Sequence, residues 1–158
     1  MPPFPEPSEA NDYLAAHIQV LRDSYSDYLG KPLVDGGLSP AGAAQQIYHA
    51  PFVVVSHNAA ADPVFTYGNK TALALFEMTW LEFTQLPSRQ SAEPPIQAER
   101  DRLLAAVTTQ GFISDYAGVR ISKGGRRFWI RNVTVWNLRD PQGHYCGQAA
   151  VYSDWADV

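Results

Sequence analysis

Cysteine and long apolar runs are scarce in this sequence, and each scarcity excludes a class of protein. Cys146 is the only cysteine, which excludes an internal disulfide and a cysteine-based zinc site. No apolar stretch approaches the length of a membrane-spanning helix. Residues 1–10 are rich in proline and lack the cationic and apolar regions of a signal peptide, which indicates a soluble leader. We therefore expect a cytoplasmic protein with no membrane partner.

Positive charge is also limited, with 12 Lys and Arg against 16 Asp and Glu and a net charge of −4. No long basic run is present to follow a phosphate backbone, so we expect no direct contact with nucleic acid. The four histidines are scattered, and no two of them have the i,i+4 spacing of a helical metal site. We therefore expect no bound metal.

The remaining composition is that of an ordinary globular protein. The chain has 158 residues, of which 46% are apolar and 18% charged, which predicts one domain over residues 11–158 after the leader. Hydrophobic period, caps and turn residues predict the individual elements. The expected helices are 11–29, 40–50, 70–78, 80–83 and 95–109, and the expected strands are 51–58, 61–69, 112–122, 126–138 and 144–155.

The strands should form one sheet. The last three make an antiparallel meander, and the two early strands must join it because a two-stranded unit is unstable alone. We predict an α+β fold with a five-stranded antiparallel sheet, helices over one face and the N-terminal helix packing outside. Strand alternation places Tyr116, Gly118 and Arg120 on one face, and Ile130 and Trp136 on one face of the next strand. Which face is inward stays open.

Two stretches resemble the PAS fold. In "VFTYGNKTALALFEMTWLEF" an aromatic strand end leads into Asn-x-x-Ala and an apolar helix, and "LRDPQGHYCGQAAVYSDW" is similar to the terminal PAS hairpin. Four blocks in order, "YGNKTALALFE", "PSRQSAE", "GVRISKGGRRFWI" and "VWNL", resemble the MEKHLA domain over about residues 11–156. This PAS-like module occurs as a stand-alone bacterial protein, the type suspected here, and in plant homeodomain–leucine zipper proteins. The resemblance implies a sensory or regulatory module.

The resemblance also bears on cofactors, none of which is identified. The segment 95–109 has no histidine of the kind that ligates haem in haem-binding relatives, so we do not expect haem. Cys146 lies on the predicted final strand, outside the helical segment in which photoreactive flavin domains keep their cysteine. We therefore expect no flavin photochemistry through this thiol, whereas non-covalent flavin binding stays open.

Two polar stretches are candidates for chemistry. Gly68 and Asn69 open a helix, but the spacing lacks the long glycine-rich loop of a phosphate site, so Asn69 is expected to cap the helix. In "PSRQSAEP", Arg89 and Glu93 are four residues apart and would pair in a helix, either as a salt-bridged loop or as a contact to a polar or anionic ligand. Ser91 has no neighbouring histidine or nucleophile elbow, so no catalytic residue is assigned.

These observations favour a non-catalytic domain that senses a small, aromatic or carboxylated molecule in a cavity between sheet and helices. Few residues follow Trp155, so we expect the output to pass through a partner or through self-association. The alternatives are a ligand-free homodimerisation or protein-interaction module and, third, a small enzyme in the same cavity. The candidate ligand-binding residues are Asn69, Trp80, Arg89, Ser91, Glu93, Tyr116, Trp136 and Gln148.

Overall fold

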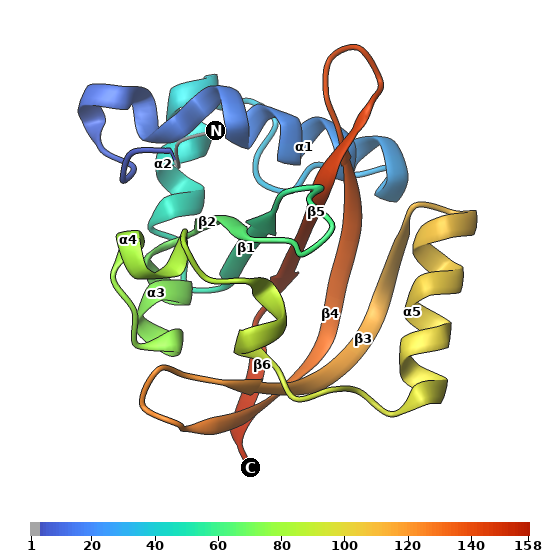
Figure 1. Cartoon of the computed structure of the whole chain (residues 1–158). Helices are drawn as coiled ribbons and strands as arrows, with labels where there is room; N and C mark the ends of the chain where they lie inside the picture. The colour runs from blue at the N-terminus through green and yellow to red at the C-terminus, as the bar shows by residue number, and fades with distance from the viewer. Residues whose placement is uncertain (1–3) are drawn as a thin grey trace.

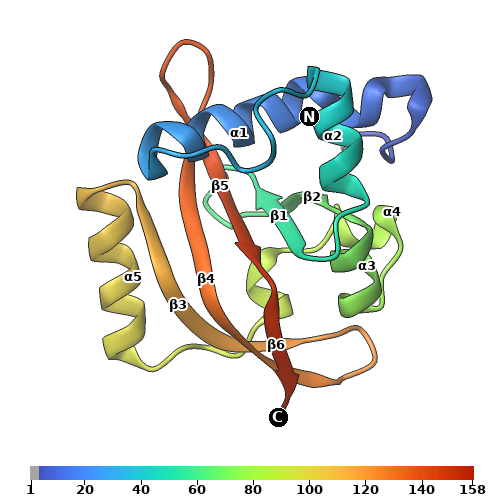
Figure 2. The same ribbon diagram turned by 180° about the vertical axis from the view of Figure 1, so that it is seen from behind.

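The computed structural model describes residues 4–158, which form one twisted antiparallel sheet between two layers of helices (Figures 1 and 2). The strands run in the order β2-β1-β5-β4-β3, and β6 pairs with β4. The PAS-like α+β fold predicted from the sequence is confirmed. The helical elements are η1 (Glu9–Leu14), α1 (Ala15–Leu29), α2 (Pro40–Tyr48), α3 (Lys70–Phe76), α4 (Trp80–Phe83), η2 (Ser88–Ser91) and α5 (Gln97–Thr109). The strands are β1 (Val53–His57), β2 (Phe65–Gly68), β3 (Phe112–Ile121), β4 (Arg127–Arg139), β5 (Tyr145–Tyr152) and β6 (Asp154–Asp157).

The first helix begins later than the sequence predicts. Asp12, Tyr13 and Leu14 all have positive φ angles, of 53°, 54° and 60°, and α1 starts only at Ala15. Asn11 does not cap α1, because its amide nitrogen donates to the Glu6 carbonyl and its oxygen accepts from the Ser8 amide. Of the predicted leader 1–10, residues 1–3 lie outside the described part of the chain. Phe4 packs on the outer core.

The outer face of the sheet is covered by α1 and α2, which cross it in Figure 2. Ile18, Leu21 and Tyr25 project from α1 at helical spacing into a core that includes Trp136 of β4. The Trp136 indole Nε1 donates to the Leu21 carbonyl at 3.1 Å, and its ring meets the edge of Tyr25 with centroids 5.0 Å apart. The N-terminal helix therefore closes this face of its own sheet.

The inner face is covered by α3, α4, η2 and α5, and Asn69 fixes where this layer begins. Its side-chain oxygen accepts from the backbone amides of Ala72 and Val54, at 3.1 and 3.2 Å. Its amide nitrogen donates to the carbonyls of Ile47 and Phe52 at 3.0 and 2.8 Å. The predicted helix cap is confirmed, and this fully buried side chain also joins α2, β1 and α3.

Two bulges bend the long strands β3 and β4. Pairing runs from Ile113–Val135 through Tyr116–Val133 to Gly118–Ile130, so β3 has one extra residue in the first interval and β4 has one in the second. The extra residue of β4 lies at Asn132, whose φ is 54°. Simple alternation, which placed Ile130 and Trp136 on one face, is therefore wrong. Ile130 faces the inner layer and Trp136 the outer one.

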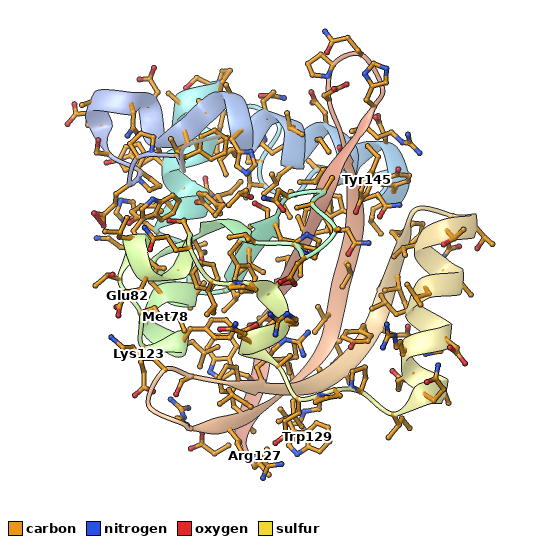
Figure 3. All side chains as sticks on the ribbon, in the orientation of Figure 1. Met78, Glu82, Lys123, Arg127, Trp129 and Tyr145 are labelled. Carbon is orange, nitrogen blue, oxygen red and sulfur yellow. The ribbon has the colours of Figure 1, made fainter. Side chains whose placement is uncertain are left out.

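The chain end and the β3–β4 hairpin complete the sheet. The predicted last strand divides at Ser153 into β5 and β6, and both halves pair with β4. At the hairpin, Lys123 forms an ion pair with Glu82 of α4, and Figure 3 labels both residues on the same side of the molecule. Ser122 donates to the carboxylate of Glu77, the residue that follows α3. The hairpin is thus tied to the inner helices at the edge of the candidate site.

Candidate functional site

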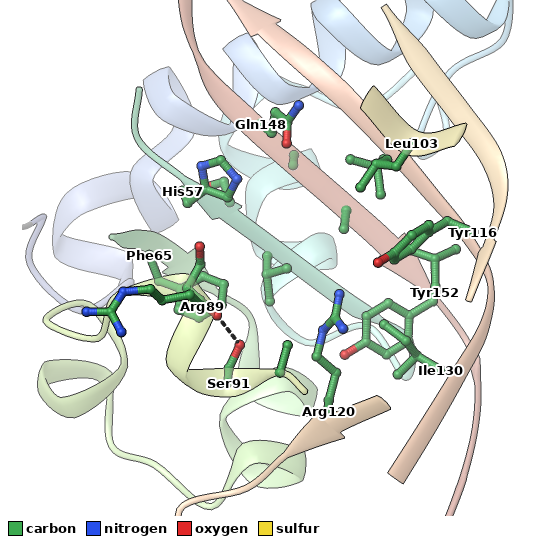
Figure 4. A pocket seen from close by; sticks show the side chains of 18 of the residues that line it. His57, Phe65, Arg89, Ser91, Leu103, Tyr116, Arg120, Ile130, Gln148 and Tyr152 are labelled. Atoms are coloured by element: carbon green, nitrogen blue, oxygen red, sulfur yellow. Dashed lines mark hydrogen bonds between the residues drawn. The ribbon is translucent and has the colours of Figure 1, made fainter. Parts of the chain in front are cut away.

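A cavity of about 260 Å³ lies between the inner face of the sheet and the segments η2 and α5 (Figure 4). Its walls are mostly apolar, and the bulge in β4 places Ile130, Val133 and Val135 on this side together. Phe65 of β2, Phe76 of α3 and Leu103 of α5 complete the apolar lining. Polar side chains occur at three places: the end formed by β3, the end formed by β1 and β5, and the mouth.

Arg120 and Tyr116 form the polar part of the β3 end. A Cβ atom at Gly118, between them on the same face of β3, would lie 3.1 Å from the Arg120 Nη1 and 3.6 Å from the Tyr116 hydroxyl. Both polar groups therefore lie close to this glycine, where a larger side chain would displace them. The one hydrogen bond that the structure gives the Arg120 side chain runs from Nη1 to the adjacent Val119 carbonyl, at 3.2 Å.

Tyr152 of β5 lies at the same end. It is 4% exposed, and its hydroxyl has no hydrogen-bond partner among the described residues 4–158. Burial raises the pKa of Tyr152, and the positive charge of Arg120 opposes that shift. The phenol therefore stays protonated at neutral pH. Tyr116, Arg120 and Tyr152 are named below as the Arg120 end of the cavity (Figure 4).

The opposite end holds His57 and Gln148. The His57 Nδ1 lies 2.8 Å from the Asn58 carbonyl, so this nitrogen carries the ring proton. Burial lowers the pKa of His57 below its ordinary value, although bonds to Asn58 and Gln148 partly offset this. The Gln148 amide nitrogen donates to the Asn137 oxygen at 3.0 Å. This end presents neutral groups at pH 7.

The mouth carries the stretch on which the sequence analysis concentrated. The predicted Arg89–Glu93 pair is not formed. Arg89 pairs with Asp62 at 3.0 Å, and these side chains are 66% and 54% exposed, while Glu93 pairs with Arg127. The reason is that η2 is a single 3-10 turn, after which the chain becomes extended and bridges Arg120 of β3. Helical i,i+4 geometry is therefore absent between the two residues.

Of the eight candidate residues, the cavity brings together five and leaves three elsewhere. Arg89, Ser91, Glu93, Tyr116 and Gln148 line it. Asn69 is committed to backbone groups, and Trp136 packs beneath α1. Trp80 also belongs to the outer core, where its Nε1 donates to the Phe4 carbonyl at 2.9 Å.

Sequence reasoning missed two groups at the Arg120 end. Arg120 was placed on the same strand face as Tyr116, but the inward direction was unknown. Tyr152 was one aromatic residue among many in the last third of the chain. A signal was nevertheless present, because a glycine between a tyrosine and an arginine on one strand face lets both side chains lie close to the strand backbone.

Comparison with known proteins identifies the family. The model of the MEKHLA domain matches residues 15–157, nearly the whole chain. The chain belongs to the MEKHLA domain family. The chain is also similar to the homeobox-leucine zipper protein ATHB-14 of Arabidopsis thaliana, with 28% identity over 99 residues. That match covers 62% of this chain and 12% of the plant protein, so the chain spans about an eighth of its curated relative.

Solved structures similar to this MEKHLA domain have the PAS fold. An RNA-binding light-oxygen-voltage receptor matches with a TM-score of 0.64 and 18% identity, over 79% of this chain and 36% of the other. A PAS domain from Colwellia psychrerythraea matches with a TM-score of 0.56 and 13% identity, over 73% and 93%. The dark structure of the Aureochrome1 light-oxygen-voltage domain matches with a TM-score of 0.54 and 21% identity, over 81% of this chain and 88% of the other. Identities this low establish the fold and nothing finer.

The light-oxygen-voltage neighbours raise the question of flavin, and the residues here do not fit a cysteine-bound flavin. Cys146 packs in the outer layer on the α1 side of the sheet, and burial raises the pKa of its thiol. The volume of about 260 Å³ also falls below the range of about 300–1,000 Å³ typical of drug-sized ligand pockets. Among the described residues no cluster of histidine, cysteine and carboxylate side chains suits a metal, and no helix is long and apolar enough to cross a membrane.

Proposed function

We propose that this MEKHLA domain is a non-catalytic sensing or regulatory domain that binds a small molecule in the cavity beneath η2 and α5. The observation that carries the proposal is the cavity itself. Its apolar walls are interrupted at one end by Arg120 and by the unpartnered hydroxyl of Tyr152. A mostly apolar cavity with a few converging polar groups is the usual form of a ligand site.

A binding role is better supported than a catalytic one. The Ser91 hydroxyl donates to the Ser88 carbonyl at 2.7 Å, so its proton is not directed at a base that would activate the oxygen. The His57 Nδ1 is engaged with the Asn58 carbonyl. The third alternative, an enzyme, therefore has the weakest support in the geometry.

Self-association is a second candidate function, as the output of binding or without any ligand. The helix α1 covers the upper outer face, whereas Trp129, on the outer side of β4 near the chain end, is 44% exposed (Figures 2 and 3). Its neighbours across the strands are Val119 and Ala156. A concentration-dependent melting temperature that disappears in Trp129→Ser would support a homodimer through this surface.

The test of the proposed function compares the wild type with Ala150→Leu, because Ala150 lines the cavity and a leucine there fills part of it. The control is Ala74→Leu, at an exposed position of α3. Native mass spectrometry of freshly purified protein and a thermal-shift screen of small molecules should show binding to wild type and Ala74→Leu, but not to folded Ala150→Leu. No bound mass and no stabilising compound, or equal binding by Ala150→Leu, would refute the proposal.

A further inference from the structure

The Arg120 end of the cavity contains more hydrogen-bond capacity than the protein uses, and this bears on the kind of ligand that the proposed function requires. A guanidinium group carries five N–H donors and a permanent charge. Arg120 forms no ion pair with any carboxylate of residues 4–158, although six other arginine and lysine side chains do. Among residues 4–158, the one hydrogen bond of its side chain goes to the Val119 carbonyl, at 3.2 Å.

The surroundings offer this cation and a neighbouring hydroxyl few polar partners. Arg120 is half-buried and stands beside apolar walls and beside the hydroxyl of Tyr152, which has less than 1 Å² of exposed surface and no partner. A buried charge is normally paired, and a buried hydroxyl normally makes a hydrogen bond. One anionic group placed between them would satisfy both, and the Tyr116 hydroxyl lies near enough to Arg120 to contribute.

Gly118 allows the two polar side chains of β3 to take these positions. A side chain at this position would press on Arg120 Nη1 at 3.1 Å and on the Tyr116 hydroxyl at 3.6 Å. Gly118 has no positive φ angle, so backbone conformation does not require a glycine there. The missing Cβ instead lets the Arg120 guanidinium and the Tyr116 hydroxyl lie close to the strand backbone at this position.

The charges and the volume of the cavity restrict the class of ligand further. The other cation of the cavity, Arg89, lies at the exposed mouth and is already neutralised by Asp62. A dianion at the Arg120 end would therefore keep an uncompensated charge, whereas a monoanion would be balanced. An engineered apolar cavity of about 150 Å³ binds one benzene ring. A cavity of about 260 Å³ therefore has room for one ring together with a charged group.

We propose that the ligand is a monocarboxylate bearing one aromatic ring or an apolar group of similar size, with the carboxylate on Arg120 and the two tyrosine hydroxyls. Arginine binds a carboxylate through two parallel N–H···O bonds, and each tyrosine hydroxyl donates one more. The ring then lies against Ile130, Val133 and Leu103. This inference rests on the proposed function of the same cavity.

The experiment uses matched charged and neutral probes. Calorimetric titrations compare benzoate and phenylacetate with benzamide and phenylacetamide, and inorganic phosphate serves as a dianionic probe in buffer alkaline enough to keep it as the dianion. The variants are Arg120→Gln, Arg120→Lys, and the control Arg100→Gln at an exposed position of α5. We expect the carboxylates to bind about 10- to 100-fold more weakly to Arg120→Gln than to the wild type. The loss of affinity should be smaller in Arg120→Lys, which keeps the charge but loses the planar guanidinium group. Arg100→Gln should bind like the wild type.

Several results would overturn the inference. These are no saturable binding of either carboxylate, equal affinity for the acids and their amides, unchanged carboxylate affinity in folded Arg120→Gln, or phosphate competing as well as benzoate. Failure of the inference is distinguishable from failure of the proposed function. If neutral molecules bind the wild type and not Ala150→Leu while carboxylates show no preference, the cavity is a ligand site of another specificity.

Discussion

Gly118 and Arg120 lie two residues apart on one face of β3, and a Cβ atom at position 118 would stand 3.1 Å from the guanidinium Nη1. The glycine in the backbone of β3 therefore affects where the charged group of Arg120 lies. The glycine weakens a strand position by about 0.5–1 kcal/mol relative to alanine. In return it lets the Arg120 guanidinium lie close to the backbone of β3 beside the cavity.

Gly118→Ala should therefore separate stability from binding. The free energy of unfolding should stay the same or rise by about 0.5 kcal/mol, because Arg120 can move its flexible end away from the new methyl group. The affinity for benzoate should fall several-fold in calorimetric titration. The control is Gly36→Ala, where the added carbon meets nothing within 4 Å. A Gly118→Ala protein that binds benzoate like the wild type would show that binding does not depend on the position that Gly118 allows Arg120 to take.

Arg89→Gln should have little effect on carboxylate binding. The Arg89 side chain is 66% exposed and already paired with Asp62, and an exposed ion pair of this kind contributes about 0–1 kcal/mol. We expect less than a ~3-fold change in the dissociation constant for benzoate, and almost no change in melting temperature. A loss as large as that of Arg120→Gln would instead place the anion site at the mouth.

Asn69→Ala should destabilise the fold more than an ordinary helix cap does. The amide satisfies four backbone groups in the buried joint between α2, β1 and α3, and alanine leaves all four without this partner. We expect the free energy of unfolding in urea to fall by about 3 kcal/mol or more. Ser39→Ala, which removes the exposed cap of α2, should cost about 1 kcal/mol. Equal losses would mean that Asn69 acts as a cap alone.

Stability should depend on the protonation of His17. Burial lowers the pKa of His17 from 6.5 to about 4, and its Nε2 lies 2.9 Å from the Ser56 hydroxyl. The unfolded chain binds the imidazole proton more tightly than the folded chain does. The contribution of neutral His17 to the free energy of unfolding is therefore complete above pH 6.5 and is lost as the pH falls toward 4. The loss amounts to at most about 3 kcal/mol.

His57, whose pKa is also lowered, contributes in the same direction. When the free energy of unfolding in urea is plotted against pH between 4 and 7, the slope should therefore be shallower in His17→Gln than in the wild type. The control is His144→Gln, at a hairpin position where the side chain is 79% exposed, and it should keep the wild-type slope. An unchanged slope in His17→Gln would mean that this imidazole titrates alike in the folded and unfolded chains.

Local patterns predicted the fold because its deciding features are local. The Asn69 cap, the stripe of Ile18, Leu21 and Tyr25, and the turn signals of the meander each depend on neighbours in sequence. The two bulges do not, because nothing in the strand pattern marks Asn132 as an extra residue. That one residue reverses the face on which Trp136 lies, and with it the assignment of Trp136 to the cavity.

The candidate site was only partly predictable, for a related reason. The sequence marked the stretch of Arg89 to Glu93 as a candidate for ligand contact, but the pairing of each side chain depends on Asp62 and Arg127, which are distant in sequence. Arg120 is distinguished by lining the cavity without a carboxylate partner among residues 4–158, and no local pattern reveals whether a distant carboxylate will approach a given arginine. The three-dimensional arrangement alone separates the neutralised cation from the free one.

The most direct measurement is a methyl NMR titration of valine-labelled protein with benzoate, because valines mark both faces of the sheet. Val133 and Val135 line the cavity, whereas Val54 and Val151 lie in the outer layer beneath α1. We predict nuclear Overhauser contacts from the benzoate ring to Val133 and Val135 and none to the outer pair. Contacts to Val54 and Val151 alone, or no contacts to any valine at saturating benzoate, would contradict a ligand site in this cavity.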